Sequence, residues 1–368
     1  MKTLIFIAAS IYYKNDGYRT RIDMEIERVK KHFHVMLFIP SNPIEDFQPI
    51  EGISVVRYTT YYSSKIKYLK NNLSFYNSLV NLIKESGRDT VICAESLIPA
   101  IKSYKVAKKY NCKFIFDCHG TEPDEFALIY GGLKGKILYH ILALLQTKVI
   151  NNTDLIVTVS NKQYDQLGIE QNHVLLPMMP SRRFIEQNNN RMKIRKKLGI
   201  QPVEEVFVYS GQNQKWQMCE QTIKIYKKIS SIRQNTRLII FTSKIDYFQN
   251  LVNREHIDNA IVISVPYDDM PSYLDACDYG FCIRNSSIIN RVASPTNVLE
   301  YLSRNVKPIL TEYVGDFSKD LPAKELAWIW NENNISRLTK EHDFDGRKYV
   351  VELDKIVNDK YIRMLRKL

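Results

Sequence analysis

The chain has 368 residues, of which 45% are hydrophobic and 25% are charged, and its net charge is +12. This length predicts two domains of ordinary size, and the composition is that of a globular protein rather than a disordered one. No G-x-G-x-x-G sequence follows a predicted strand, which argues against a dinucleotide-dependent oxidoreductase. The mild basicity suits an anionic small ligand, an anionic membrane surface or nucleic acid. Nucleic acid ranks last, because the basicity is its only support.

The cysteines and the N-terminal segment indicate the compartment. None of the six cysteines forms a C-x-x-C pair, which predicts reduced thiols and no zinc site. The apolar run within residues 1–10 is short and a helical pattern follows it at once, so we interpret it as a strand rather than a signal peptide. No apolar segment reaches the roughly 18 residues that span a bilayer. We therefore expect a cytoplasmic protein.

In chain order, strands and helices alternate through the first half, the pattern of a β-α-β series with a parallel, doubly wound sheet. The predicted strands are Leu4–Ala8, Val35–Pro40, Ser54–Tyr58, Thr90–Ala94, Lys113–Asp117 and Leu155–Val159. The predicted helices between them are Arg19–His32, Lys67–Ser86, Pro99–Tyr110 and Leu133–Asn151.

A polar, irregular segment, Met178–Arg191, is interpreted as a linker, and a second α/β series follows it. The sequence thus predicts one domain over residues 1–180 and another over residues 192–347. The second series has predicted strands at Val206–Ser210, Arg237–Thr242, Ala260–Val265, Tyr279–Ile283 and Lys307–Thr311, and predicted helices at Trp216–Ile232, Met270–Cys277 and Pro295–Arg304.

The most informative stretch begins with Ser294-Pro295-Thr296, which follows a predicted strand and opens a helix. Serine is a favoured N-cap and proline suits the first helical position, so we expect Ser294 to cap this helix. The free N–H groups and positive dipole of such a helix start suit a phosphate group. Glu300 lies one turn beyond Thr296 on the same face, where its carboxylate could accept hydrogen bonds from a ribose diol.

At these residues the chain resembles the nucleotide-sugar glycosyltransferases of the GT-B fold, close to family 4, many of which carry a similar "SPTK..EYL..G.PVI" segment. The resemblance implies two tandem doubly wound, Rossmann-like α/β domains with a cleft between them. It also implies that a C-terminal helix over residues 348–368 packs back on the first domain. In the family the helix start holds the donor pyrophosphate and the glutamate holds the ribose, which assigns these roles to Ser294–Asn297 and Glu300. The chain departs from the family at Asn297, usually lysine, and at Val292, where the broader family has a further glutamate.

Loops beyond the carboxyl ends of parallel strands are the places where open α/β sheets bind ligands. His119 follows one such strand in the first half, and Glu95 follows its neighbour. The resemblance implies that His119 contacts the donor sugar near the reaction centre and that Lys215 binds the diphosphate, so we expect these two residues to be catalytic. It adds the following residues to the donor site, with Gln212 standing where the family has arginine: Gly17, Gly211, Gln212, Arg284 and Asn290.

The resemblance implies transfer of a sugar, with retention of configuration, from a nucleotide diphosphate sugar to a hydroxyl of a bacterial cell-surface glycan precursor. UDP is the default nucleotide, and no metal or other cofactor is expected, because Lys215, Arg284 and the helix start would balance the diphosphate charge. Basic aromatic stretches at Tyr61–Lys70 and Leu133–Lys148 suit peripheral contact with the inner face of the cytoplasmic membrane and a lipid-linked saccharide acceptor. Two alternatives stay open: a nucleotide-sugar epimerase of the same fold, and a non-catalytic protein that binds glycans or lipids.

Overall fold

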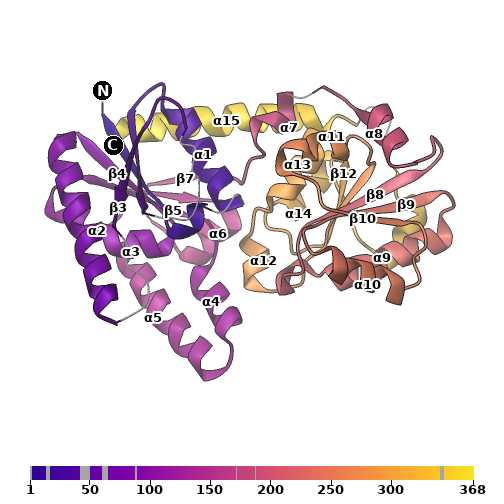
Figure 1. Cartoon of the computed structure of the whole chain (residues 1–368), viewed down its shortest axis with the longest axis horizontal. Helices are drawn as coiled ribbons and strands as arrows, with labels where there is room; N and C mark the ends of the chain where they lie inside the picture. The colour runs from indigo at the N-terminus through magenta and orange to yellow at the C-terminus, as the bar shows by residue number, and fades with distance from the viewer. Residues whose placement is uncertain are drawn as a thin grey trace. The chain divides into compact units, whose positions relative to one another are not determined.

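The structure is a computed structural model, and it describes residues 2–13, 17–41, 50–59, 65–87, 89–170, 172–186, 188–339 and 344–368. The chain forms two compact units (Figure 1). The first contains Met1–Pro177 and Val357–Leu368, and the second contains Met178–Ile356. The last helix, α15 (Gly346–Lys367), therefore begins in the second unit and ends in the first.

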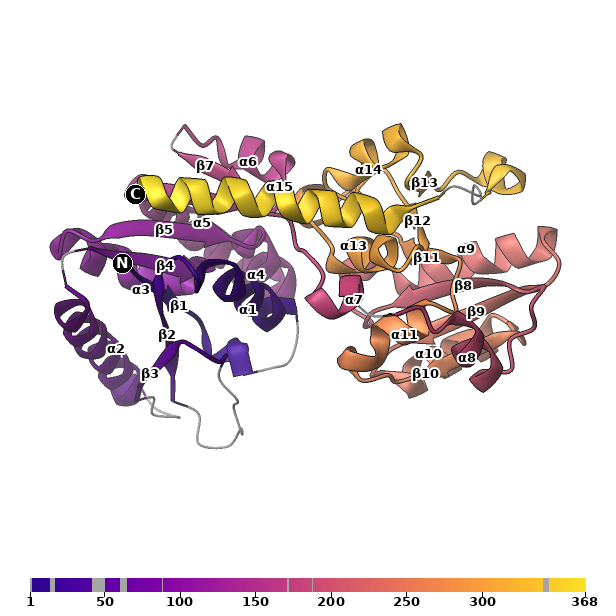
Figure 2. The ribbon, with the colours of Figure 1, turned by 90° about the horizontal axis from the view of Figure 1, so that it is seen from above.

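The first unit has a seven-stranded parallel sheet in the order β3-β2-β1-β4-β5-β6-β7. Helices cover both of its faces, as Figures 1 and 2 show. Its strands are β1 (Thr3–Ile7), β2 (His34–Pro40), β3 (Ser54–Tyr58), β4 (Thr90–Glu95), β5 (Lys113–Cys118), β6 (Leu155–Thr158) and β7 (His173–Leu175), and its helices are α1 (Gly17–Val29), α2 (Lys65–Ser86), α3 (Leu97–Lys109), α4 (Glu122–Tyr130), α5 (Gly132–Ile150) and α6 (Asn161–Leu167).

The second unit has a six-stranded parallel sheet in the order β10-β9-β8-β11-β12-β13. Its strands are β8 (Glu205–Ser210), β9 (Thr236–Phe241), β10 (Ala260–Ile263), β11 (Tyr279–Cys282), β12 (Lys307–Leu310) and β13 (Trp328–Ile329). Its other helices are α7 (Arg182–Glu186), α8 (Arg191–Lys197), α9 (Cys219–Ile232), α10 (Ile245–Arg254), α11 (Met270–Leu274), α12 (Ile288–Val292), α13 (Thr296–Ser303) and α14 (Phe317–Asp320).

These findings confirm the prediction of two doubly wound α/β sheets, and the strand sequences explain it. Central strands of a parallel sheet are covered on both faces, so they read as continuous apolar runs. In β1, all five residues of the run TLIFI are buried. Both sheets reverse their strand order at one point, between β1 and β4 in the first unit and between β8 and β11 in the second. Ligands of such sheets bind beside that point, at the carboxyl ends of the strands.

The prediction of an irregular linker over Met178–Arg191 was wrong, because this polar segment contains α7. A tertiary contact orders it: the buried Arg304 donates hydrogen bonds from Nη1 to the Phe184 carbonyl and from Nη2 to the Asn188 carbonyl. Asp275 balances the charge of Arg304 through an ion pair of 2.6 Å. Sequence patterning also missed α4, α6 and α10, along with the short helices α8, α12 and α14, most of which are too short to show a clear period.

Close packing at Gly280 positions the start of α13 against the sheet. A Cβ atom at Gly280 of β11 would lie only 2.4 Å from the ring of Tyr301 of α13, so a larger residue would push this helix away. The hydroxyl of Tyr301 accepts a hydrogen bond from the Ser210 N–H at 3.0 Å, which ties α13 to the carboxyl end of β8. The first turn of α13 is therefore held beside the strand-order reversal of the second sheet.

Candidate functional site

Two loops meet at the strand-order reversal of the second sheet, one after β8 and one after β11. The first loop contains Lys215, and the second begins at Arg284. Arg284 Nη1 lies 3.4 Å from the carbonyl oxygen of Gln217, and Asn290 Nδ2 lies 3.3 Å from the carbonyl oxygen of Trp216. The structure thus brings Arg284 and Asn290 together with the loop that contains Lys215.

The loop after β8 is held by its own hydrogen bonds. The Tyr209 hydroxyl donates to the Gln212 carbonyl at 2.7 Å, and Gln217 Oε1 accepts from the Gln212 N–H at 2.9 Å. Gly211 donates its N–H to the carbonyl of Phe241, at the end of β9. Lys215 follows in the short 3-10 helix Lys215–Gln217 with an exposed side chain. This arrangement holds the backbone at the base of Lys215 and leaves its ammonium group at the surface.

Arg284 and Asn290 support the site from inside the fold, because both are buried. Arg284 donates from Nη1 to its neighbouring Ile283 carbonyl at 3.0 Å, and Asn290 donates from Nδ2 to Asn285 Oδ1 at 2.7 Å. These side chains donate hydrogen bonds to backbone and side-chain oxygens in and beside the two loops. Such contacts hold the two loops in place.

The predicted cap of the helix start was wrong in detail. Helix α13 begins at Thr296 with Pro295 in the N-cap position, and no side chain caps it. Ser294 instead accepts a hydrogen bond at Oγ from the Met178 N–H at 3.1 Å, so its hydroxyl is used to hold another segment. The side chain of Asn297 reaches the carbonyl of Ser210 at 3.5 Å from Nδ2, while its buried Oδ1 has no hydrogen-bond partner. The helix start therefore lies at the end of β8 with its backbone N–H groups uncapped by side chains.

Glu300 lies one turn into α13 and is buried, with 7% of its surface exposed. Its Oε1 accepts a hydrogen bond of 2.9 Å from the hydroxyl of Tyr267, a partner that the sequence did not point to. Burial raises the pKa of Glu300 to about 7, and the Tyr267 hydrogen bond partly opposes this rise. A ligand that donates hydrogen bonds to Glu300 would stabilise its ionised carboxylate, which is buried and has the Tyr267 hydroxyl as a donor.

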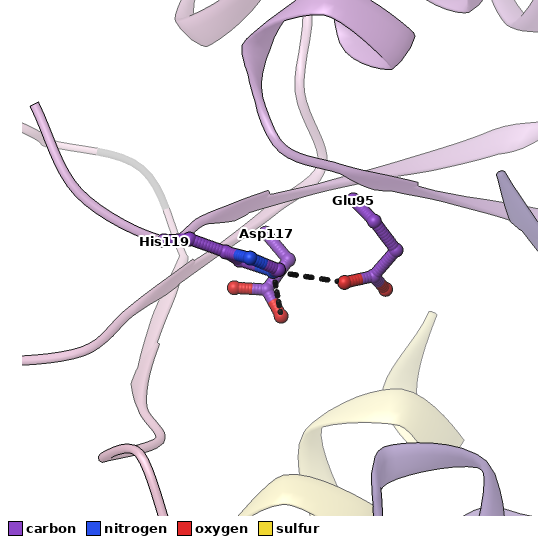
Figure 3. A group of neighbouring side chains, drawn as sticks. All are labelled: Glu95, Asp117 and His119. Atoms are coloured by element: carbon purple, nitrogen blue, oxygen red, sulfur yellow. Dashed lines mark hydrogen bonds and ion pairs between the residues drawn. The ribbon is translucent and has the colours of Figure 1, made fainter. Parts of the chain in front are cut away.

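In the first unit, His119 lies directly after β5 and contacts two carboxylates (Figure 3). Its Nε2 lies 2.9 Å from Glu95 Oε2 and 3.5 Å from Asp117 Oδ2. Both carboxylates are fully buried, whereas 13% of the His119 side chain is exposed. Tyr18, next to Gly17 at the start of α1, packs its ring 5.3 Å from the His119 ring. Gly17, His119 and Glu95 thus belong to one corner of the first sheet.

Three further residues, Arg21, Glu25 and Tyr361, form buried contacts behind Asp117, and the sequence did not predict these contacts. Arg21 of α1 donates to both oxygens of Asp117, from Nη2 to Oδ1 at 2.8 Å and from Nε to Oδ2 at 3.1 Å. It also lies 2.9 Å from Glu25 Oε1. The hydroxyl of Tyr361 in α15 donates to Glu25 Oε2 at 3.0 Å. Helical spacing places Arg21 and Glu25 on the inner face of α1, which is the one available signal, but nothing in the sequence pairs them with β5.

The same corner has the donor atoms of a metal site. One ligand atom from each of Glu95, Asp117 and His119 lies within 4.8 Å of the others. Arg21 already pairs with both oxygens of Asp117, so a guanidinium group supplies the positive charge next to this carboxylate. A metal ion here would have to compete with that buried ion pair.

Comparison with known proteins identifies the fold. Residues 23–168 match the family model of Glycosyltransferase Family 4. No curated protein matches the chain by sequence. Among solved structures, sucrose-phosphate synthase from Thermosynechococcus elongatus superposes with a TM-score of 0.76 at 11% identity, covering 100% of this chain and 99% of that chain. Anabaena HepE in complex with UDP and glucose superposes with a TM-score of 0.70 at 12% identity, and the match covers 100% of both chains. WaaG, a glycosyltransferase involved in lipopolysaccharide biosynthesis, superposes with a TM-score of 0.64 at 14% identity, and the match covers 99% of this chain and 94% of that chain.

These matches agree with the two parallel sheets of seven and six strands and with the resemblance seen at Ser294–Glu300. The chain therefore has the GT-B fold, and residues 23–168, within its first unit, match the Glycosyltransferase Family 4 model.

Proposed function

We propose that the protein transfers a sugar, with retention of configuration, from a nucleotide diphosphate sugar to a hydroxyl of a bacterial cell-surface glycan precursor. One observation carries this proposal: the loop that contains Lys215 and the first turn of α13, which lies one turn before the buried Glu300, are both at the carboxyl end of β8, beside the strand-order reversal of the second sheet. A cation, free N–H groups and a buried carboxylate are the groups that a diphosphate and a ribose require. The HepE structures contain UDP or UDP-glucose, which supports a UDP-sugar as donor.

The proposed mechanism relies on stabilising the leaving group. Lys215 and the N–H groups of α13 would bind the diphosphate, whose negative charge grows as the glycosidic bond breaks. Glu300 would accept hydrogen bonds from the ribose hydroxyls. The two carboxylates beside His119 are fully buried, which favours the leaving phosphate as the group that takes the acceptor proton. In this scheme the donor site needs no metal ion.

Lys215→Ala is expected to weaken binding of the cognate nucleoside diphosphate by about 10–100-fold, since a hydrogen bond to a charged group contributes roughly 1.5–3 kcal/mol. A thermal-shift panel of UDP, GDP, CDP and dTDP, each with magnesium or EDTA, would identify the base and test metal dependence. Lys224→Ala, on an exposed face of α9, is the matched control and should bind like the wild type. Absence of any nucleotide response would favour the non-catalytic alternative. Conversion of the donor without an acceptor would favour the epimerase.

An apolar surface on the hairpin of α4 and α5 supports a membrane-associated acceptor. In Figure 1 this hairpin extends beyond the sheet of the first unit. It carries seven of the fourteen large hydrophobic side chains that are exposed among the described residues, including Leu133 at 75% and Leu144 at 66%. Residues 126–150 contain Lys134, Lys136 and Lys148 but no acidic residue. We propose that this surface contacts an anionic bilayer, where apolar and basic side chains are both favoured.

Gly135 allows the hairpin to close, because a Cβ atom there would lie 2.5 Å from the carbonyl oxygen of Ala127. No helix in the described part of the chain is long and apolar enough to cross a membrane, so the proposed contact is peripheral, at the inner face of the cytoplasmic membrane. The other basic stretch, Tyr61–Lys70, gives no further support: residues 60–64 and the side chains of residues 65–69 lie outside the described part of the chain.

The triple variant Leu133→Ser, Ile137→Ser and Leu144→Ser is expected to lose at least about tenfold in binding to phosphatidylglycerol-containing vesicles, since it removes apolar area from the proposed contact. Vesicle flotation measures this directly. The triple variant Met192→Ser, Val203→Ser and Ile232→Ser removes equally exposed apolar residues from the second unit and should float like the wild type. Equal flotation of both variants would exclude the hairpin as the contact surface.

A further inference from the structure

The two carboxyl oxygens of Glu300, in α13, have different surroundings. Oε1 accepts the 2.9 Å hydrogen bond from the Tyr267 hydroxyl. Oε2 makes no hydrogen bond with any described residue, and it is not one of the buried polar atoms that lack a partner there, so it reaches the protein surface. Oε2 is therefore an oxygen that a ligand can contact without displacing a protein group.

Tyr267 is the one hydrogen-bond partner of this carboxylate within the described part of the chain, where Glu300 also forms no ion pair. An ionised carboxylate only accepts hydrogen bonds, and a tyrosine hydroxyl keeps its proton at pH 8, so the hydroxyl is the donor. A donor at this place favours the ionised form of a carboxyl group that is otherwise buried. The contact therefore acts on both the orientation of the Glu300 carboxylate and its charge.

Helix α7 holds Tyr267 in place. The Tyr267 ring packs 5.4 Å from the ring of Phe184, which is fully buried. The next residue, Asp268, forms an ion pair of 2.6 Å with Arg183 of α7. The Phe184 carbonyl in turn accepts a hydrogen bond of 3.1 Å from Arg304, at the C-terminal end of α13. The segment that supports Tyr267 is thus attached to the same helix that carries Glu300.

Such support has a direct effect on ligand binding. A glutamate side chain rotates about three bonds, and a ligand that needs one orientation loses affinity when it must fix these bonds itself. A hydrogen bond that fixes the carboxylate in the free protein reduces this loss, because the orientation is set before the ligand binds.

We propose that Tyr267 is a positioning residue of the donor site: by holding Oε1 of Glu300 it fixes the carboxylate and leaves Oε2 to accept hydrogen bonds from the ribose hydroxyls of the donor. Tyr267 itself does not contact the nucleotide and acts through Glu300. The proposal rests on the proposed function for the identity of the ligand, whereas the contact between Tyr267 and Glu300 belongs to the free protein.

Calorimetric titration at pH 8 with UDP and with 2′,3′-dideoxy-UDP, which lacks both ribose hydroxyls, tests this role. Tyr267→Phe should bind UDP about tenfold more weakly than the wild type, since it removes a hydrogen bond to a charged group. The two proteins should bind dideoxy-UDP within about twofold of each other. Tyr273→Phe is the matched control, because it removes a hydroxyl of α11 that accepts a hydrogen bond from Lys197 at 2.7 Å, and it should bind both nucleotides like the wild type. Equal losses for UDP and dideoxy-UDP in Tyr267→Phe, or no loss for UDP, would overturn the proposal.

A measurement without nucleotide separates this proposal from the proposed function. Carbon-13 NMR of glutamate-labelled protein follows the titration of Glu300, whose signal is assigned by its loss in Glu300→Gln. The pKa of Glu300, about 7 in the wild type, should rise in Tyr267→Phe, because burial then acts without the opposing hydrogen bond. An unchanged pKa would show that Tyr267 does not hold the carboxylate and would also overturn the proposal. If the wild type binds no nucleoside diphosphate, the proposed function fails and the ribose role fails with it, whereas the NMR shift still establishes that Tyr267 holds Glu300.

Discussion

Glu300→Gln is expected to stabilise the protein at pH 8 by about 1–3 kcal/mol and, in the same variant, to remove most of its nucleotide affinity. The stability gain follows from the folded-state pKa of Glu300, which burial raises from the ordinary 4.5 to about 7. A glutamine keeps the oxygen that accepts the Tyr267 hydrogen bond but carries no charge to desolvate. The two effects together would mark Glu300 as a residue whose function costs stability.

The pH dependence has a definite sign. Because the folded protein binds this proton more tightly than the unfolded chain, the wild type loses stability as the pH rises from about 4.5 to about 7 and regains none above it. The loss approaches an order of 3 kcal/mol at pH 8. Urea unfolding should therefore separate Glu300→Gln from the wild type at pH 8 and show little difference near pH 4.5. Glu352→Gln, an exposed glutamate of α15, is the control and should not change the free energy of unfolding.

Nucleotide affinity should depend on the same ionisation. Ribose hydroxyls donate hydrogen bonds to the ionised carboxylate, so UDP binding should weaken as the pH falls below about 7 and the carboxyl becomes protonated. Titration calorimetry between pH 6 and pH 8 measures this trend. At pH 8 the Gln variant should bind about 10–100-fold more weakly than the wild type. A variant that is more stable yet binds UDP normally would show that Glu300 is buried for another reason.

Much of the fold could be predicted from the sequence, because apolar strands and amphipathic helices produce local patterns. The strand Ser54–Tyr58 was predicted with both ends correct, and the other predicted strands differ from the observed ones by a few residues at their ends. The polar segment around α7 could not be predicted, since it is ordered by Arg304, more than a hundred residues further along the chain. Ser294 shows the same limit at the site: its sequence context is that of an N-cap, but a tertiary contact with Met178 uses its hydroxyl.

The candidate site divides in the same way. The positions of Lys215 and His119 in loops after strands could be predicted, because a parallel sheet collects its carboxyl ends at one edge, while their roles stay predictions. Residues that act through buried contacts could not. Tyr267 meets Glu300 from a different helical segment, and Arg21 meets Asp117 across 96 positions of sequence. No local periodicity in the sequence predicts such pairs. The pairing of the charged side chains at the site can therefore be found only from the structure.

Arg21→Met should be the most destabilising of the substitutions considered, with an expected loss of about 3–5 kcal/mol at pH 7. A methionine fills much of the arginine volume but leaves Asp117 as an uncompensated buried charge beside Glu25 and Glu95, and removing one partner of a buried pair typically costs this much. Arg19→Met on the same helix removes a partly exposed pair with Asp23 and should cost less than about 1 kcal/mol.

A second substitution separates charge from packing in this result. If the cost of Arg21→Met is the unpaired charge, adding Asp117→Asn should recover part of the lost stability, because the asparagine needs no counterion. Urea unfolding of the four proteins at pH 7 measures this recovery. Equal losses for Arg21→Met and Arg19→Met would mean that Asp117 does not depend on Arg21 for its counter-charge.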